Sequence, residues 1–345
     1  MKRKGLLYDV YETEKKIDEN SKLVAVAQIG DQKFETLAAA VAAAESGATV
    51  TLMTDATGEG VVIDKNITID FNGKTYTFNK AVGSAGTVTL GFQILKDNNV
   101  VLKNGTLTST AVTEGKEVKV LIQNYANLTL TDMTLTDNTA HILYALSNNS
   151  GKIDVNGNTN ITTDATAFDV YDFDSAGYSV PSMTVNTTGV ITGKIEVSDT
   201  ATLAISGGSF SVKPEAAWCA EGYGPDKEPV DDYYGVHKHV AGAAVKQNEK
   251  AASCENDGSY DNVVYCTVCD AEMSRETVVV PAGHVIAKGE AQTKTCTQDG
   301  WAAYEYCTEC DYTTKKVIPA GITDRSELCD ICGCFFYTCD IGVGR

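Results

Sequence analysis

Cysteine and histidine residues in the last third of the chain have the spacing of metal ligands. Ten of the 11 cysteines fall in the last 92 residues, and they recur in the order His, Cys, Cys-x2-Cys. The first set is His239, Cys254, Cys266 and Cys269, and the second set is His284, Cys296, Cys307 and Cys310. The two thiolates of a Cys-x2-Cys turn, a third Cys and a His supply the four ligands of a closed tetrahedral zinc site. Each set therefore predicts one structural zinc site.

A third set departs from this order. Ile322 stands where the His is expected, and four cysteines follow, namely Cys329, Cys332, Cys334 and Cys339. Four cysteines can bind a metal without a histidine, so they could form a third site. Zinc would explain how about 40 residues hold a fold without a large core. Disulfide bonds and free thiols are the alternatives, although three cysteines per set leave one unpaired unless the sets cross-link.

The densest acidic stretch of the chain contains Asp169, Asp172 and Asp174. Alternation in an extended segment would place Asp172 and Asp174 on the same side. Paired carboxylates are what glycoside hydrolysis requires, one as the acid and one as the base or nucleophile. The same three residues could instead contact a glycan or bind calcium through carboxylates and carbonyls, or they could form a solvated acidic loop.

A short pattern of strand and corner must position these residues. Val100, Leu102, Asn104 and Leu107 define the pattern, and its copies start at positions 67, 100, 128, 153, 183 and 203. Aliphatic residues two apart predict a strand with one buried face, and the Asn, Asp, Gly or Thr that follows predicts a bend. Because so small a unit cannot bury its own apolar face, the copies must stack as a solenoid. The abundant Asn, Thr and Ser residues would then bond in ladders between copies.

A helix is predicted over residues 34–45, where apolar residues fall at helical spacing among many alanines. The open end of a solenoid exposes apolar core and unpaired strand edges, so this helix is expected to cap it. The alternative is an ordinary amphipathic helix that packs on another sheet.

Residues 34–52 resemble the opening segment of right-handed parallel β-helix proteins of the pectate-lyase-like superfamily, with Phe34, Leu37, Val41, Gly47 and Leu52 carrying the match. Together with the recurring pattern, the resemblance covers about residues 24–212. It implies a helix-capped parallel β-helix whose first strand is residues 49–52. The family contains polysaccharide lyases, glycoside hydrolases and surface proteins without known catalysis, so fold alone does not decide function.

Lyase chemistry in this family uses an arginine close to calcium-binding aspartates. The arginines of this chain are Arg3, Arg275, Arg325 and Arg345, so the β-helix region contains none. The lyase interpretation therefore lacks its usual base.

The cysteine-rich sets resemble tandem repeats of large surface proteins from anaerobic Gram-positive bacteria, where such repeats often follow β-helix regions. Residues 252–258 and 295–300 carry the match, whereas Asp270 and Asp311 replace the usual Gly. The resemblance implies an exported, modular protein and no particular activity.

Composition and charge narrow the class of protein. The net charge is −18 with 28 Lys and Arg residues, which argues against a nucleic-acid groove. No apolar run is long enough for a membrane span. Residues 1–22 are too short and acidic for a signal-peptide core, so either a leader was removed or the chain stays inside. The predicted domains are a tail at 1–22, a capped β-helix at 23–212, a linker at 213–238, repeats at 239–283 and 284–321, and a partial unit at 322–345.

The sequence therefore predicts a non-enzymatic, exported cell-surface or adhesion-type binding protein whose partners are glycans or host or cell-surface proteins. One alternative is a carbohydrate-active β-helix hydrolase or lyase that uses Asp169, Asp172 or Asp174. A second alternative is a solenoid spike or fibre subunit, which trimeric assembly would distinguish.

Overall fold

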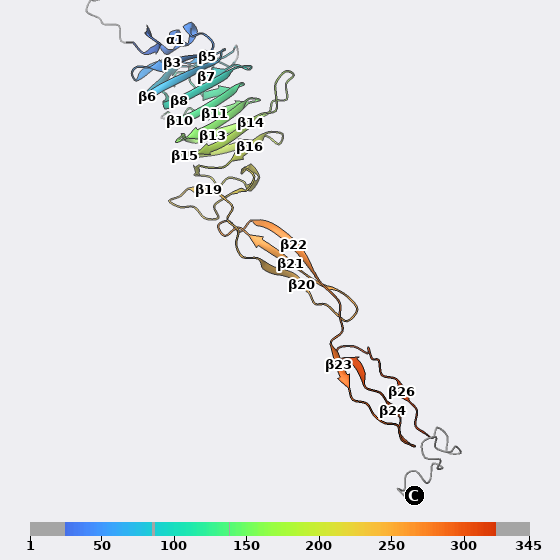
Figure 1. The fold of residues 1–345 in the computed structure, drawn as a ribbon. Coiled ribbons are helices and arrows are strands. Elements are labelled where there is room, and N and C mark those ends of the chain that lie inside the picture. The colour runs from blue at the N-terminus through green and yellow to red at the C-terminus, as the bar shows by residue number, and fades with distance from the viewer. Residues whose placement is uncertain (1–24, 85–86, 138, 322–345) are drawn as a thin grey trace, which may run out of the picture. The chain divides into compact units, whose positions relative to one another are not determined.

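The computed structural model describes residues 25–84, 87–137 and 139–321, and the chain is mainly β (Figure 1). It divides into two compact units. The first unit comprises the residues up to Val240 together with Thr267–Asp270, and the second comprises Ala241–Cys266 and the residues from Ala271 onward. Each unit is described by itself below.

The first unit contains one short α-helix, one 3-10 turn and a succession of strands. The helix α1 spans Leu37–Ala43 and the 3-10 turn η1 spans Ala216–Trp218. The strands are β1 (Ala27–Ile29), β2 (Gln32–Phe34), β3 (Ala48–Leu52), β4 (Ala56–Glu59), β5 (Val61–Ile63), β6 (Ile67–Lys80), β7 (Leu90–Ile94), β8 (Asn99–Ser109), β9 (Val120–Asn124), β10 (Asn127–Thr136), β11 (Tyr144–Asn149), β12 (Lys152–Gly157), β13 (Asn160–Tyr171), β14 (Ser182–Thr187), β15 (Val190–Val197), β16 (Thr202–Ile205), β17 (Ser209–Phe210), β18 (Tyr223–Pro225) and β19 (Tyr234–Lys238).

The described strands from β4 to β16 pair with one another only in parallel, and the pairings form three columns. Column 1 runs through β3, β6, β8, β10, β12, β14 and β16. Column 2 runs through β4, β6, β8, β10, β13, β15 and β17. Column 3 runs through β5, β7, β9, β11, β13 and β15. The chain visits the columns in turn, so each strand lies beside the equivalent strand of the next copy (Figure 1).

The corners between columns 1 and 2 lie at the polar residues that the sequence pattern predicted to bend the chain. Asn104 has a φ of 62° and Asp132 a φ of 54°, and Gly157 has a φ of 64°. Short polar residues and glycine reach this left-handed conformation at low cost. The aliphatic residues before each corner are buried, as Val100 and Leu102 illustrate with exposed fractions of 1% and 0%. The predicted alternation and corners are thus confirmed for these copies.

Helix α1 covers one end of the strand stack, with Leu37, Ala40 and Val41 buried in the same apolar cluster as the strands. The backbone N–H of Ala39 donates to Oγ1 of Thr36 at 3.0 Å, so Thr36 caps the helix N-terminus. The helix is shorter than the predicted residues 34–45, because Phe34 ends β2 and pairs with Ala27 of β1.

Asparagine ladders join neighbouring copies, as the sequence predicted. The buried Asn124 donates through Nδ2 to Oδ1 of Asn148 at 3.0 Å, and Nδ2 of Asn148 donates to the carbonyl oxygens of Gly151 and Ser182. At a corner, Nδ2 of Asn127 donates to Oδ1 of Asn99 at 3.0 Å. These bonds satisfy polar groups at positions where the strands turn.

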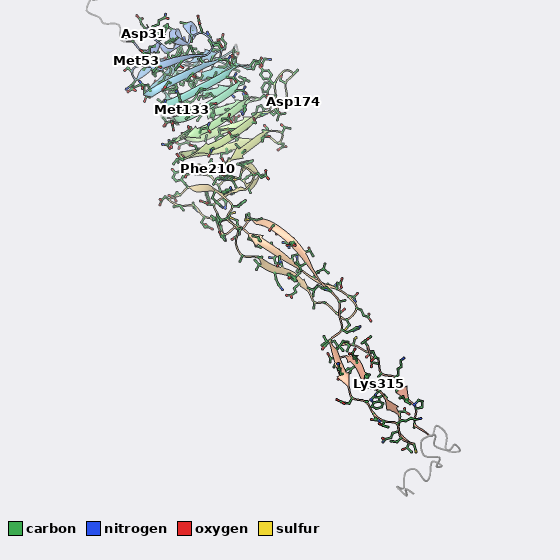
Figure 2. The ribbon with its side chains drawn as sticks, in the orientation of Figure 1. Asp31, Met53, Met133, Asp174, Phe210 and Lys315 are labelled. Carbon is green, nitrogen blue, oxygen red and sulfur yellow. The ribbon has the colours of Figure 1, made fainter. Side chains whose placement is uncertain are left out.

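Residues 213–238, which the sequence indicated as a loop-rich linker, contain η1, β18 and β19. Strand β19 pairs antiparallel with β17, which places Gly235 opposite Ser209 and Tyr234 opposite Phe210. The segment therefore extends the sheet at the last strand of column 2, and Phe210 is buried there (Figure 2).

The second unit is built from short antiparallel strands with little core. Strands β20 (Val245–Lys250), β21 (Gly258–Tyr265) and β22 (Glu272–Val280) form one sheet. Strand β23 (Ile286–Gly289) pairs with β25 (Tyr304–Cys307), and β24 (Gly300–Trp301) pairs with β26 (Val317–Ile318). Among its described hydrophobic residues, the buried ones are Val263, Cys266 and Cys307.

Candidate functional site

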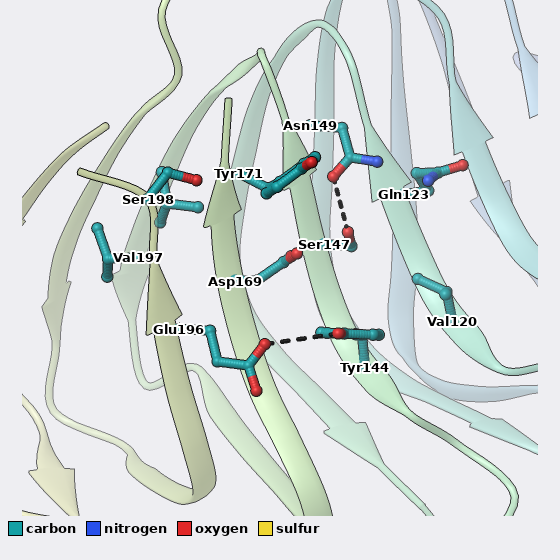
Figure 3. A pocket seen from close by; sticks show the side chains of 11 residues that line it. Val120, Gln123, Tyr144, Ser147, Asn149, Asp169, Tyr171, Glu196, Val197 and Ser198 are labelled. Atoms are coloured by element: carbon teal, nitrogen blue, oxygen red, sulfur yellow. Dashed lines mark hydrogen bonds between the residues drawn. The ribbon is translucent and has the colours of Figure 1, made fainter. Parts of the chain in front are cut away.

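A groove on the outer face of column 3 collects polar and aromatic side chains from four strands (Figure 3). Its volume is about 450 Å³. Parallel register aligns one polar residue from each strand in a row across the groove. That row consists of Gln123 on β9, Ser147 on β11, Asp169 on β13 and Glu196 on β15. Outward-facing residues of neighbouring strands lie about 4.8 Å apart, so the row forms one continuous polar track.

Asp169 is the residue of this row with the most perturbed acidity. Burial is the main cause that raises the pKa of Asp169 to about 6, and the neighbouring Glu196 adds to it. The hydroxyl of Ser147 and the backbone N–H of Asn148 oppose the shift. Its Oδ1 atom is buried and has no hydrogen-bond partner within the described part of the chain. Near neutral pH this carboxyl group can therefore exchange a proton with a bound molecule.

Glu196 lies next to Asp169 and is held by two hydroxyl groups. The hydroxyl of Tyr144 donates to Oε2 of Glu196 at 3.5 Å, and that of Thr166 donates to Oε1 at 3.2 Å. Burial raises the pKa of Tyr144, and the two carboxylates add to the shift. Tyr171 borders the same groove and is 51% exposed. The two carboxyl groups can form hydrogen bonds with the hydroxyl groups of a sugar. The neighbouring tyrosine rings can pack against the flat face of the same sugar.

The acidic residues singled out in the sequence do not lie together in the structure. Only Asp169 lines the groove. Asp172 accepts hydrogen bonds from the backbone N–H of Asp174 at 2.9 Å and from Oγ1 of Thr200 at 2.9 Å, which lowers its pKa. Asp174 has a φ of 46° and lies on a loop that projects from the stack of strands (Figure 2). The carboxylate of Asp172 therefore stabilises this loop through these hydrogen bonds.

Aromatic packing holds the same loop on the outside of the stack. Phe173 and Tyr178 lie 4.7 Å apart between ring centroids, and both pack against Tyr125, which follows β9 two copies earlier. Nζ of Lys96 lies 5.0 Å from the centroid of Tyr178. These packing contacts are sufficient to explain the position of the loop. The metal-ligating groups found in the described ranges include none of the three aspartates, so the predicted calcium contact gains no support.

Two groups of Cys and His side chains in the described ranges could hold a metal ion. One group is Cys254, His284, Cys307 and Cys310, whose ligand atoms all lie within 4.8 Å of one another. Sγ of Cys254 lies 3.4 Å from Sγ of Cys307, and Sγ of Cys310 lies 3.4 Å from Nδ1 of His284. Ligands of tetrahedral zinc, with bonds of about 2.0 to 2.3 Å, lie about 3.3 to 3.8 Å apart. The donor set and its spacing fit such an ion.

Within this group the pKa of Cys254 is raised to about 12 by its hydrogen bonds with Cys310 and Cys307, whereas that of Cys307 is lowered. Burial alone would raise the pKa of Cys307, but hydrogen bonds from the Glu309 backbone N–H and from Cys254, His284 and Cys310 outweigh it and lower the pKa to about 6. The thiolate is the form that binds metals. All three cysteines of the group are free thiols. A ring stack between His284 and Tyr312, with centroids 4.3 Å apart, fixes the imidazole plane.

The other group is His237, His239, Cys266 and Cys269. Sγ of Cys269 lies 3.5 Å from Nδ1 of His239. Nδ1 of His237 lies 2.7 Å from Oδ1 of Asp226, so a carboxylate orients that ring and leaves Nε2 for a ligand. Metal-binding histidines commonly have such a carboxylate partner. A Cβ on Gly224 would lie 2.6 Å from Cε1 of His239, so only glycine leaves room for that ring.

These groups differ from the sets predicted from spacing. Cys254 lies with His284, Cys307 and Cys310, whereas the sequence had assigned it to His239, Cys266 and Cys269. His237 takes its place in the first group. Cys296, predicted to join the second set, is in neither group and is disulfide-bonded. The predicted third site of Cys329, Cys332, Cys334 and Cys339 lies outside the described residues.

Sequence reasoning missed Glu196, Tyr144 and His237. Glu196 follows Asp169 by 27 residues in an ordinary alternating strand, so only parallel register reveals that they are neighbours. His237 lies in β19, and His239 follows the end of that strand by one residue. Their spacing of two residues was the available signal, since residues i and i+2 of an extended segment share a face.

No family model, no curated protein and no solved structure matches this chain. In the described ranges, the search for apolar helices long enough to cross a membrane finds none.

Proposed function

We propose that the first unit is a right-handed parallel β-helix and that the chain is a non-enzymatic, exported cell-surface or adhesion-type protein that binds glycans. The observation that carries this proposal is the groove on column 3, where Tyr144 and Tyr171 flank the polar row of Gln123, Ser147, Asp169 and Glu196.

The pattern of strand pairing supports the fold. Parallel ladders in three columns, visited in turn by the chain, are the arrangement expected of a solenoid whose copies bury one another's apolar faces. Helix α1 packs on the strands at one end, as a cap would. The resemblance of residues 34–52 to the opening of pectate-lyase-like β-helices agrees with this arrangement.

The chemistry of the groove favours a carbohydrate over other ligands. Carboxylate, amide and hydroxyl groups can bond to the hydroxyl groups of a sugar, while tyrosine rings cover its apolar face. The groove residues include no lysine or arginine, so an acidic polysaccharide would meet no countercharge. A neutral or amino sugar therefore fits the groove best.

The Cys/His groups support a spacer role for the second unit. Zinc suits the three sulfur donors and one nitrogen donor of Cys254, His284, Cys307 and Cys310, and it suits the two sulfur and two nitrogen donors of the other group. A unit with so little buried hydrophobic surface needs another source of stability, which a metal can supply. The proposed cofactor is thus structural zinc.

A binding screen with matched variants tests the glycan proposal. The full-length protein is titrated with neutral, amino and acidic polysaccharides of plant and mucin origin. We expect neutral or amino sugars to bind, and we expect Tyr171→Ala to weaken binding by about tenfold, the equivalent of about 1.4 kcal/mol. Tyr306→Ala, at an exposed tyrosine of the second unit, should leave affinity unchanged. Equal loss in both variants, or no binding to any glycan, would reject the groove as the site.

A carbohydrate-active enzyme is the second candidate, and the adjacency of Asp169 and Glu196 favours it. A carboxyl group with a pKa of about 6 beside a second carboxyl group is the pair that glycoside hydrolysis uses. Incubation with the same polysaccharides distinguishes the candidates, because an enzyme releases reducing ends. In that case Asp169→Asn would abolish release while glycan binding persists.

A further inference from the structure

The two Cys/His repeats hold their His and Cys-x2-Cys ligands by the same backbone bonds. The N–H of Cys266 donates to the carbonyl of Ala271 at 2.8 Å, and that of Cys307 donates to the carbonyl of Tyr312 at 2.9 Å. A second pair of bonds also matches. The N–H of Thr267 donates to the carbonyl of Val240 at 2.9 Å, and the N–H of Thr308 donates to the carbonyl of Val285 at 3.0 Å. Each repeat therefore has one end that presents His, Cys and Cys.

The remaining cysteine of each repeat lies in a second turn that the two repeats share. The N–H of Ser253 donates to the carbonyl of Asn256 at 2.9 Å, and the N–H of Thr295 donates to the carbonyl of Gln298 at 2.9 Å. Oδ1 of Asp257 accepts from the Ala282 N–H at 2.6 Å, and Oδ1 of Asp299 accepts from the Ala320 N–H at 2.7 Å. Cys254 and Cys296 occupy equivalent positions in these turns.

Strand β21 separates the two ends of the first repeat. Cys254 precedes β21 and Cys266 follows it, and the strand has eight residues. At about 3.3 Å per residue the strand is about 26 Å long. Ligands of one zinc ion lie less than about 4 Å apart. Cys254 therefore cannot share an ion with Cys266 and Cys269 of its own repeat.

We infer that a metal ion held by Cys254, His284, Cys307 and Cys310 cross-links two consecutive repeats, with Cys254 supplied by the first repeat and the other three ligands by the second. The inference rests on the proposed metal occupancy and adds which repeat each ligand comes from. Two observations support the inference. Sγ of Cys254 lies 3.4 Å from Sγ of Cys307, and Cys254 and Cys266 lie beyond opposite ends of β21.

The cross-link has a consequence for the segment between the repeats. The chain from Val280 to His284 connects β22 to the second repeat, and it contacts the Cys254 turn through the Gly283 N–H, which donates to the Ser253 carbonyl at 3.3 Å. A metal that joins Cys254 to His284 closes a loop of about 30 residues around this segment. Metal binding should then protect residues 280–285 from proteolysis.

Cadmium NMR on the unmodified, full-length protein provides the first test, because the chemical shift of bound cadmium depends on how many thiolates surround the ion. Besides any resonance from cadmium bound by Cys329, Cys332, Cys334 and Cys339, the cross-repeat assignment predicts two different resonances, one from an ion with three thiolates and one histidine and one from an ion with two of each. Two resonances that both indicate three thiolates, as one set per repeat would give, would overturn the inference but leave metal binding intact. No bound cadmium or zinc would overturn both the inference and the proposed zinc.

A double-mutant cycle measured by cobalt titration identifies the partners of Cys254. We expect Cys254→Ser to weaken one site on the order of 100-fold and to be non-additive with Cys310→Ser, because both remove a ligand of one ion. It should be additive with Cys269→Ser. The matched control is Thr295→Ala, which changes the equivalent turn of the second repeat without removing a cysteine and should leave both sites unchanged. Coupling of Cys254 to Cys269 instead of Cys310 would contradict the cross-link.

Discussion

Oδ1 of Asp226 lies 2.7 Å from Nδ1 of His237, in a segment where the Asp226 N–H also donates to the Gly235 carbonyl at 2.9 Å. The carboxylate thus fixes the ring and leaves its other nitrogen available as the ligand atom that His237 contributes beside His239, Cys266 and Cys269. A Cβ on Gly235 would lie 2.6 Å from Oδ2 of Asp226, so glycine keeps space for this carboxylate.

We therefore expect Asp226→Asn to weaken metal binding at this group by about 10- to 100-fold, since partners of metal-bound histidines orient the ring and raise its basicity. Competition with a chelating dye measures the affinity. Asp232→Asn changes an exposed aspartate of the same connection and serves as the control. Unchanged affinity in Asp226→Asn would mean that His237 is not a ligand.

Asp169 predicts a pH dependence of stability with a defined sign. Its pKa is raised from 3.8 in the unfolded chain to about 6 in the folded protein, mainly by burial. The folded state then binds more protons between these two values, so this group makes the protein less stable as the pH rises from about 4 to about 6. Asp169→Asn removes that contribution.

The measurement is urea denaturation of the wild type and of Asp169→Asn at several pH values. The unfolding free energy of Asp169→Asn should increase relative to that of the wild type between about pH 4 and pH 6. The difference between the two proteins should stay constant above about pH 7. Carboxyl groups remote from Asp169 contribute equally to both proteins and cancel in the difference. A difference that does not change with pH would show that Asp169 has an ordinary pKa.

The ladder between Asn124 and Asn148 predicts a loss of stability on substitution. Asn148 is fully buried and its amide bonds to Asn124, Gly151 and Ser182. Asn148→Leu would leave two buried carbonyl oxygens with fewer donors, which we expect to cost about 1 to 3 kcal/mol of unfolding free energy. Asn127→Leu, at an exposed corner, should cost less than about 0.5 kcal/mol. Equal costs in urea titrations would contradict the importance of burial.

The sequence predicted the strands and corners of the first unit well, because they depend on local chemistry. Val100 and Leu102 must be buried on one face, and Asn104 can adopt a positive φ wherever it occurs. The groove depends instead on which strands lie side by side. Asp169 meets Glu196 only through parallel register between β13 and β15, and loop lengths between copies vary too much for register to be read from spacing.

The metal groups were partly predictable for a similar reason. The Cys-x2-Cys turns bring their own two thiolates together, so Cys307 and Cys310 were correctly placed with His284. The fourth ligand could not be assigned from order alone. Cys254 is closer in sequence to Cys266 than to Cys307, but the straight strand β21 carries it to the opposite end of the repeat. Distance along the chain is a poor guide where a strand intervenes.

Metal removal should affect the two units differently. The first unit buries a continuous apolar cluster that includes Phe78, Phe92 and Phe168, whereas Val263, Cys266 and Cys307 are the buried hydrophobic residues of the described second unit. On the proposed zinc occupancy, metal ligation, which can contribute about 10 to 16 kcal/mol, adds to the disulfide bond of Cys296 in stabilising the second unit. A strong chelator should unfold the second unit and leave the first folded.

Calorimetry with and without chelator measures this difference. Two transitions are expected for the metal-loaded protein, and the one from the second unit should disappear on chelation and return when zinc is added. Hydrogen exchange assigns the transitions, since amides of β21 and β22 should lose protection while those of β8 and β10 keep it. If chelation leaves both units protected, disulfide bonds or packing must stabilise the second unit, and the zinc assignment would be wrong.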